Sequence, residues 1–153
     1  MMETLEPLLK KHPFLKDLEE QYIHRLVSCA KNVRYNENEY ICHEGQEAAA
    51  FYLIREGRAA IEIYSPEKGM IRIQTIEAGD VVGWSWLIAP YRWHFDIRAI
   101  EPIRAFEFDG KCLRGKCEED HDLGYEMMKR FAHLIEERLQ AARLQLLDIY
   151  GDK

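Results

Sequence analysis

The sequence contains no apolar run of the roughly 20 residues that a membrane-spanning helix requires. Its longest apolar stretches, such as the one around Val81–Pro90, are interrupted or too short. The N-terminus also lacks the basic start and apolar centre of a secretory signal. We therefore expect a cytoplasmic protein that neither crosses nor binds a membrane, and whose four cysteines are reduced.

The chain lacks an excess of positive charge, with 21 Lys and Arg against 27 Asp and Glu, and no run of Lys and Arg stands out along it. The formal net charge is −6, so the overall electrostatic field repels the phosphates of nucleic acids. We expect no nucleic acid binding by this chain. Its length of 153 residues suits a single domain, which we predict over residues 1–153.

Catalytic motifs are missing as well. Gly83-Trp-Ser-Trp-Leu87 resembles the Gly-x-Ser-x-Gly turn of hydrolases but lacks the second glycine. No His-x-His pair is present to supply a metal site of the kind found in β-roll metalloenzymes. No base, nucleophile and orienting group stand at a suggestive spacing. The sequence predicts a protein that is not an enzyme and has no cofactor.

The cysteines offer only weak signals. Cys112, Cys117 and His121 could be drawn as a zinc site, but three potential ligands at loose spacing do not define one. Cys29 and Cys42 occur in apolar segments, where we expect small core residues. We predict no metal.

The hydrophobic pattern changes twice along the chain. Residues 1–30 carry apolar side chains at helical spacing, residues 31–110 show short Val-, Ile-, Tyr- and Phe-rich stretches separated by turn residues, and residues 120–150 return to a helical pattern. Eight short strands suit a closed roll, so the predicted fold is a mainly β, jelly-roll-like β-roll with N-terminal helices and a long C-terminal helix. The predicted strands are Asn32–Tyr35, Tyr40–Cys42, Ala50–Arg55, Ala59–Tyr64, Ile71–Ile76, Val81–Val82, Phe95–Ala99 and Ile103–Asp109.

The segment Leu123–Ile149 predicts one amphipathic helix, which Asp120 or Asp122 can cap. Its charged run Glu136-Glu137-Arg138 is expected on the outer, solvated side. A helix of this length is about 40 Å long, more than so small a roll can cover. We therefore predict a homodimer in which two copies of this helix pack together. The apolar stripe consists of Met128, Phe131, Ile135, Leu139, Ala142, Leu146 and Ile149.

Gly45 and Gly57 bracket a strand of alternating apolar residues within Tyr40–Ile61. This arrangement, continued by Ile76–Gly83 and by the long helix, resembles the cyclic-nucleotide-binding domain family over essentially the whole chain. The order of elements looks like the sensor half of regulators of the catabolite-activator type. Their helix-turn-helix domain is not expected here, since the chain ends at Lys153.

The resemblance implies a ligand cassette in which a glycine and a helix approach a cyclic phosphate through backbone N–H groups, an arginine neutralises it, and a glutamate accepts from the ribose. This chain differs from that pattern. Trp84 stands where the glutamate would be, and an indole accepts no hydrogen bond. Arg92 lies one residue before the arginine position, where Trp93 stands instead.

All three tryptophans fall within ten residues. One interpretation is an altered pocket, in which indoles stack on a planar or apolar ligand while Arg92 and His94 hold an anionic group. A second is that the rings fill the former cavity as core, and a third is cyclic nucleotide binding through unusual contacts. We predict a non-enzymatic sensor for a small, anionic or nucleotide-like ligand; the alternative is a ligandless module that binds a partner protein. The candidate ligand-binding residues are Gly83, Trp84, Ser85, Trp86, Arg92, Trp93 and His94.

Overall fold

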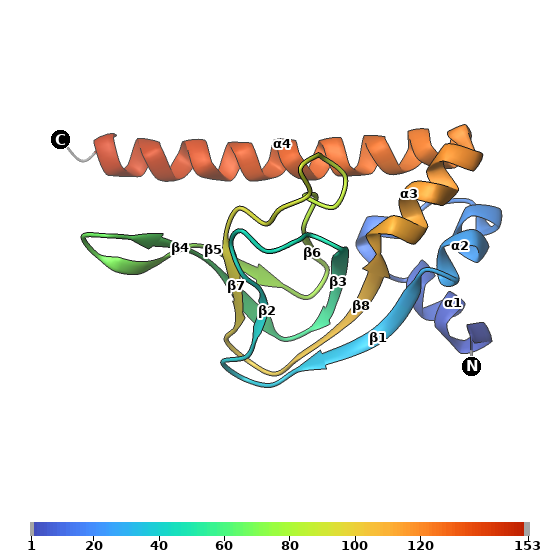
Figure 1. Ribbon diagram of the computed structural model, residues 1–153, viewed down its shortest axis with the longest axis horizontal. Helices are drawn as coiled ribbons and strands as arrows, with labels where there is room; N and C mark the ends of the chain where they lie inside the picture. The colour runs from blue at the N-terminus through green and yellow to red at the C-terminus, as the bar shows by residue number, and fades with distance from the viewer. Residues whose placement is uncertain (1, 152–153) are drawn as a thin grey trace.

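The computed structural model describes the backbone of residues 2–151 and side-chain exposure over residues 5–148. Two four-stranded antiparallel sheets, ordered β1-β8-β3-β6 and β2-β7-β4-β5, form a roll, with the long C-terminal helix along one side and the other helices at one end (Figure 1). This confirms the predicted fold class, and every predicted strand is present with boundaries within two residues. The strands are β1 Ala30–Tyr35, β2 Tyr40–Cys42, β3 Ala50–Glu56, β4 Arg58–Ser65, β5 Gly69–Glu77, β6 Val81–Val82, β7 Asp96–Ala99 and β8 Ile103–Asp109.

Strand β3 divides two hydrophobic cores. Phe51 and Leu53 belong to the core shared with the helices, whereas Tyr52 and Ile54 belong to the core inside the roll. Because successive side chains of a strand point to opposite faces, a strand between two cores is apolar at every position. That accounts for the uninterrupted run Phe51–Ile54.

Three short helices precede the roll: α1 Met2–Lys10, the single-turn η1 Pro13–Leu15, and α2 Glu20–Val27. Their apolar faces bury Leu9, Leu15 and Leu26 in the core shared with the roll. They gather at one end of the molecule, beside the point where β8 leaves the sheet (Figure 1).

Helix α3, Gly110–Glu119, is an element that the sequence pattern did not indicate. It contains two glycines, and Leu113 is its one large side chain that is fully buried, so its periodicity is weak. The Asp109 carboxylate caps it by accepting from the backbone N–H of Cys112 at 3.0 Å. Capping and burial of Leu113 stabilise a helix that its composition does not favour.

Helix α4 runs from His121 to Gly151, which confirms the predicted long helix, and the Asp120 carboxylate accepts from the N–H of Leu123. Its first half packs on the domain, with Leu123 and Phe131 fully buried. Further along, leucines are exposed, including Leu139 at 62% and Leu146 at 54%. The side chain of Ile149 lies outside the described residues. No helix in the part of the chain that the structure describes is long and apolar enough to cross a bilayer.

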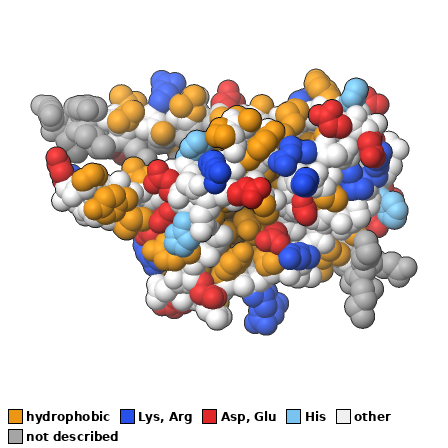
Figure 2. Space-filling view, in the orientation of Figure 1, with side chains coloured by type: hydrophobic (Ala, Val, Ile, Leu, Met, Phe, Trp, Pro, Cys, Tyr) orange, Lys and Arg blue, Asp and Glu red, His pale blue; other side chains and the backbone are white. Residues whose placement is uncertain are grey.

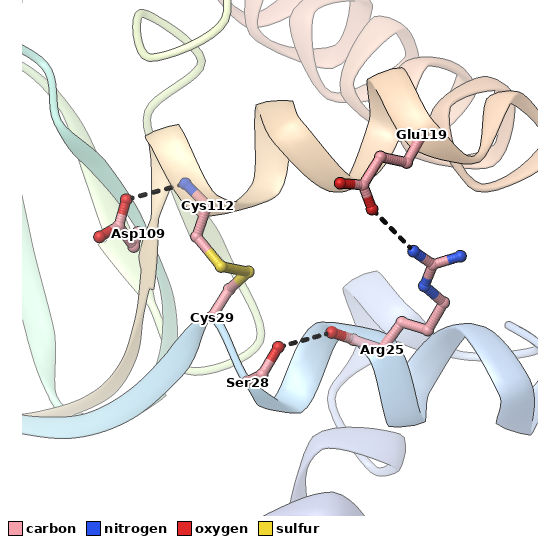
Figure 3. Close-up of a disulfide and its surroundings, with 6 residues drawn as sticks. All are labelled: Arg25, Ser28, Cys29, Asp109, Cys112 and Glu119. Atoms are coloured by element: carbon pink, nitrogen blue, oxygen red, sulfur yellow. Dashed lines mark hydrogen bonds and ion pairs between the residues drawn. A yellow bond between two sulfur atoms is a disulfide. The ribbon is translucent and has the colours of Figure 1, made fainter.

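The prediction of four reduced cysteines is wrong, because Cys29 and Cys112 form a disulfide (Figure 3). The fold brings the end of α2 beside the start of α3, with 5.7 Å between the two Cα atoms across a sequence separation of 83 residues. No local pattern reveals such a pairing. Cys42 and Cys117 are free, and Cys42 is buried as expected of a core residue. Since Cys112 is bonded to Cys29, it is not a free thiolate ligand for zinc.

The turn between β3 and β4 requires glycine. Gly57 has a φ of +92°, and a Cβ there would lie 2.2 Å from the carbonyl oxygen of Pro102. We expect Gly57→Ala to lower the free energy of unfolding by about 2 kcal/mol or more, because strain at positive φ adds to a contact with backbone. Gly115→Ala is the matched control: its Cβ would meet nothing within 4 Å, and in helix α3 it should stabilise by up to about 1 kcal/mol. Urea denaturation measures both; equal midpoints for the two variants would contradict the expectation.

His12 ties the N-terminal segment to the roll and makes stability depend on pH. Its Nδ1 accepts from the N–H of Phe14 at 3.1 Å, so the ring is neutral and Nε2–H donates to the carbonyl of Ile54 at 3.0 Å. Burial lowers the pKa of His12 below its usual 6.5. The unfolded chain therefore binds the proton first, and the stabilising contribution, complete above pH 6.5, is lost as pH falls from there through the folded pKa.

We expect the melting temperature to fall as the pH is lowered from 7.5 to 5, and His12→Gln to weaken that dependence. His94→Gln, at an exposed position, is the matched histidine substitution and should preserve it. Thermal unfolding across this pH range is the measurement. A pH dependence identical in the protein and in His12→Gln would show that His12 does not cause it.

Candidate functional site

The candidate site is the cassette loop, residues 83–95 between β6 and β7. It leaves β6 at Gly83, whose φ is +95°, and its returning limb is held by backbone hydrogen bonds. The Gly45 N–H donates to the Trp93 carbonyl at 2.8 Å, and the Trp93 N–H donates to the Gln46 carbonyl at 3.0 Å. The returning limb of the loop is therefore held against Gly45 and Gln46.

Trp93 lies inside the roll. Its side chain is 4% exposed and belongs to the core formed by the inner faces of the two sheets. The six-membered part of the indole abuts the Cα of Gly83, where a Cβ would come within 2.5 Å of Trp93 Cη2. Phe95 flanks it, with ring centroids 6.2 Å apart. The space next to the backbone of Gly83 is thus occupied by an indole.

Trp86 lies in the other core, facing the helices. It is 0% exposed, stacks on Phe51 at 5.1 Å and meets the edge of Phe131, a residue of α4, at 5.3 Å. Its Nε1–H has no hydrogen-bond partner among the residues that the structure describes. Trp86 therefore joins the cassette loop to α4 through aromatic packing.

Trp84 lies between these two environments and is half-buried. Its ring contacts Phe95 edge-on at 6.4 Å, and the guanidinium of Arg138 lies 5.7 Å from its centroid. The three tryptophans expected in one cluster therefore occupy three environments, because the loop crosses the edge of the roll as it turns.

The polar members of the predicted set do not converge on the indoles. Ser85 is 4% exposed, whereas Arg92 and His94 are exposed. The Nη1 of Arg92 donates to the carbonyl of Gly45 at 3.2 Å, outside the core that holds Trp93. The structure brings the candidate residues into one loop without directing Arg92 or His94 to a shared centre.

Arg138 corrects the expectation that the run Glu136–Arg138 is solvated. It is half-buried, contacts Trp84 and donates to the carbonyl of Val81. Burial lowers the pKa of Arg138, although Asp80 and Glu137 nearby favour its charge. The helical pattern alone could not show this contact, because the cassette loop lies some fifty residues earlier in the chain.

Arg114 of α3 is a second contact that the sequence did not reveal. It donates to the carbonyl of Trp86, and its guanidinium lies 4.4 Å from the centre of the Tyr91 ring. Helix α3 therefore contacts the cassette loop at two points, since the guanidinium of Arg114 donates to a backbone oxygen and packs on an aromatic ring.

A recess of about 390 Å³ opens between β5 and α4. Arg138 and Gln145 line it from α4, and Asp80 lies at its edge. Ile76 supplies apolar surface. Such a lining can donate and accept hydrogen bonds around a small planar molecule, which is what binding a ligand here would require.

Comparison with protein families matches residues 32–120 to the cyclic nucleotide-binding domain, a span that includes both sheets and the cassette loop. The chain belongs to this family.

Solved structures share the fold of this cyclic nucleotide-binding domain. A cyclic nucleotide-binding domain from Methylobacillus flagellatus superimposes with a TM-score of 0.81 at 18% identity, covering 96% of this chain and 83% of that one. A putative cyclic nucleotide-binding protein from Geobacter metallireducens superimposes with a TM-score of 0.77 at 24% identity, covering 88% of this chain and 97% of that one. The sensor domain of the transcriptional regulator DNR from Pseudomonas aeruginosa has a TM-score of 0.72 at 16% identity, covering 91% of this chain and 93% of that one.

Among curated proteins, the domain is 26% identical over 114 residues to human cGMP-dependent protein kinase 2. The match includes 72% of this chain but 14% of the kinase, so the domain resembles one part of a much longer protein.

Proposed function

We propose that this domain is a non-enzymatic sensor that does not hold a cyclic nucleotide in the manner of its family. The observation that carries the proposal is the position of Trp93 against Gly83, inside the roll. Backbone N–H groups at a cassette glycine can bind a phosphate only if the phosphate can approach them. An indole packed on Gly83 excludes that approach.

The other two contacts expected of the cassette are also replaced. Trp84 offers a ring face but no acceptor for a ribose hydroxyl. Arg92 is exposed and donates to the Gly45 carbonyl, so it does not stand where a buried phosphate would need it. These replacements favour a ligand without a cyclic phosphate.

The ligand class that fits best is a nucleoside or a similar planar molecule, seated in the recess between β5 and α4. Arg138, whose guanidinium lies 5.7 Å from the centroid of Trp84, lines this recess and supplies polar groups within a volume of about 390 Å³. A regulatory subunit of a cAMP-independent protein kinase A from Trypanosoma cruzi, with TM-score 0.64 and 19% identity, was solved bound to guanosine. That ligand carries no phosphate.

Thermal unfolding with cAMP, cGMP, adenosine and guanosine tests this function. A ligand at 100 times its Kd adds about 2.7 kcal/mol, which raises the melting temperature by roughly 5–10 °C. We expect a nucleoside to produce such a shift and the cyclic nucleotides to produce none. Arg138→Gln should abolish the response, while Arg92→Ala, its matched control, should retain it. A shift with cAMP or cGMP would contradict the proposal.

The exposed half of α4 supports a homodimer, with a second copy of this helix as the partner. Leu139, Leu146 and Leu147 are 62%, 54% and 60% exposed. Figure 2 shows hydrophobic side chains along the α4 side of the visible face. The double variant Leu139→Lys, Leu146→Lys should change the mass in light scattering from dimer to monomer, while Gln140→Lys, at an exposed polar position, should leave it unchanged. A monomer before substitution would exclude this arrangement.

A ligandless interaction module is the second candidate. The full burial of Trp86 and the packing of Trp93 within the roll favour it, since both rings act as core. A flat response to every compound in the panel, with a dimer retained in solution, would support this function over the sensor.

A further inference from the structure

The disulfide lies at a junction between the N-terminal helices and the cassette. Cys29 is between α2 and β1, and Cys112 is in the first turn of α3 (Figure 3). Cys29 is 6% exposed and Cys112 is half-buried. The bond therefore fastens the start of α3 to the end of α2.

Ion pairs attach the far end of α3 to the last turn of α2. Arg25 of α2 lies 2.9 Å from the Asp120 carboxylate and 3.5 Å from that of Glu119, both at the end of α3. The side chain of Glu119 is 75% exposed, and ion pairs at such exposed positions contribute little to stability. The covalent bond is therefore the stronger of the two attachments between α2 and α3.

Movement of α3 would reach the cassette loop directly. Arg114 of α3 donates to the carbonyl of Trp86 and covers the ring of Tyr91. Gly110, also in α3, fits closely against Trp86, where an added Cβ would be 2.9 Å from Trp86 Cβ. A change at Cys112 is thus two residues from a side chain that holds the loop.

Cys29 is only 6% exposed, but it lines a recess through which a small thiol can approach the bond. This recess has a volume of about 370 Å³ and is lined by Cys29 together with Ser28 and Lys31. Such a volume admits a small thiol. By contrast, burial raises the pKa of both Cys42 and Cys117, which disfavours their reactive thiolate forms.

We propose that Cys29–Cys112 is a reversible thiol–disulfide site, through which small or protein dithiols set how firmly α3 is held against α2 and hence the mobility of the cassette loop. The attacking thiolate forms a bond to the Sγ of Cys29, and the electron pair of the broken S–S bond leaves on the Sγ of Cys112. The second thiol of the reductant then attacks its own mixed disulfide and releases Cys29. The protein gains two electrons and two protons, and the dithiol becomes a disulfide. This inference does not depend on the ligand assigned under the proposed function.

Folded protein equilibrated with defined ratios of reduced and oxidised dithiothreitol, then quenched with acid and alkylated, tests the chemistry. Two of the four cysteines should be alkylated in the oxidised protein and all four in the reduced protein. Reoxidation should restore the cross-linked Cys29–Cys112 peptide. A bond that resists dithiothreitol until the protein unfolds would overturn the proposal.

Hydrogen exchange of residues 84–93 tests the link to the cassette. We expect the backbone amides of this segment to exchange faster when the disulfide is reduced. Cys117→Ser should show the same difference between the oxidised and reduced states. The double variant Cys29→Ser, Cys112→Ser should exchange like the reduced protein and ignore dithiothreitol. Should that variant not fold, chemically reduced protein with its native sequence supplies the comparison. Equal exchange in the oxidised and reduced states would also overturn the proposal.

Discussion

Reduction of the Cys29–Cys112 bond is expected to lower the free energy of unfolding by about 4 kcal/mol, because the bond closes a long loop in the unfolded chain and restricts its conformations. The two cysteines are 83 residues apart, so most of the domain lies inside that loop. For a domain of this size the melting temperature should fall by on the order of 10 °C. Urea denaturation with and without dithiothreitol measures the difference.

Free thiols provide the control for that experiment. Cys117→Ser removes a half-buried thiol outside the bond and should leave the difference between the oxidised and reduced midpoints intact. In Cys29→Ser, dithiothreitol should have no further effect, because no bond remains to reduce. If the midpoints with and without reductant coincide in the unmodified protein, the bond does not contribute to stability.

Trp93→Ala is expected to lower the free energy of unfolding by about 3–5 kcal/mol, as removal of a buried aromatic side chain leaves a cavity. Trp93 is 4% exposed and packed against Gly83 in the core of the roll. The vacated space has the shape of an indole, so free indole added in solution should bind and recover part of the lost stability. Thermal unfolding of the variant with and without indole is the measurement.

Trp84→Ala is the matched substitution for Trp93→Ala, since it removes the same side chain from a half-buried position in the same loop. It should cost less than Trp93→Ala and show no recovery with indole. Equal losses in the two variants, or recovery in neither, would mean that Trp93 does not fill the roll as the structure describes.

Local patterns in the sequence were sufficient for the strands and for α4. The short apolar segments such as Ala50–Glu56 and the helical recurrence after Leu123 are patterns of neighbouring residues, and so is the cap that Asp120 forms. The departure of Trp84 and Trp93 from the family's cassette was also visible, because it is a matter of which residue stands at which position.

Helix α3 was not predictable in the same way. Its glycines and polar residues give no strong period, and it is stabilised by the Asp109 cap and by burial of Leu113 against other elements. The directions of the tryptophans were equally undetermined, since the loop sends Trp86 to the helices and Trp93 into the roll. Proximity in the chain did not imply a shared pocket.

The sequence by itself determined the strands, the long C-terminal helix, their order and the altered cassette, because each of these follows from residues close together in the chain. Only the tertiary structure decided which distant residues meet: Cys29 with Cys112, and Arg138 with Trp84. Such contacts depend on how all the elements pack into two cores at once. No segment carries that information alone, and the candidate ligand surface and the redox site both consist of such contacts.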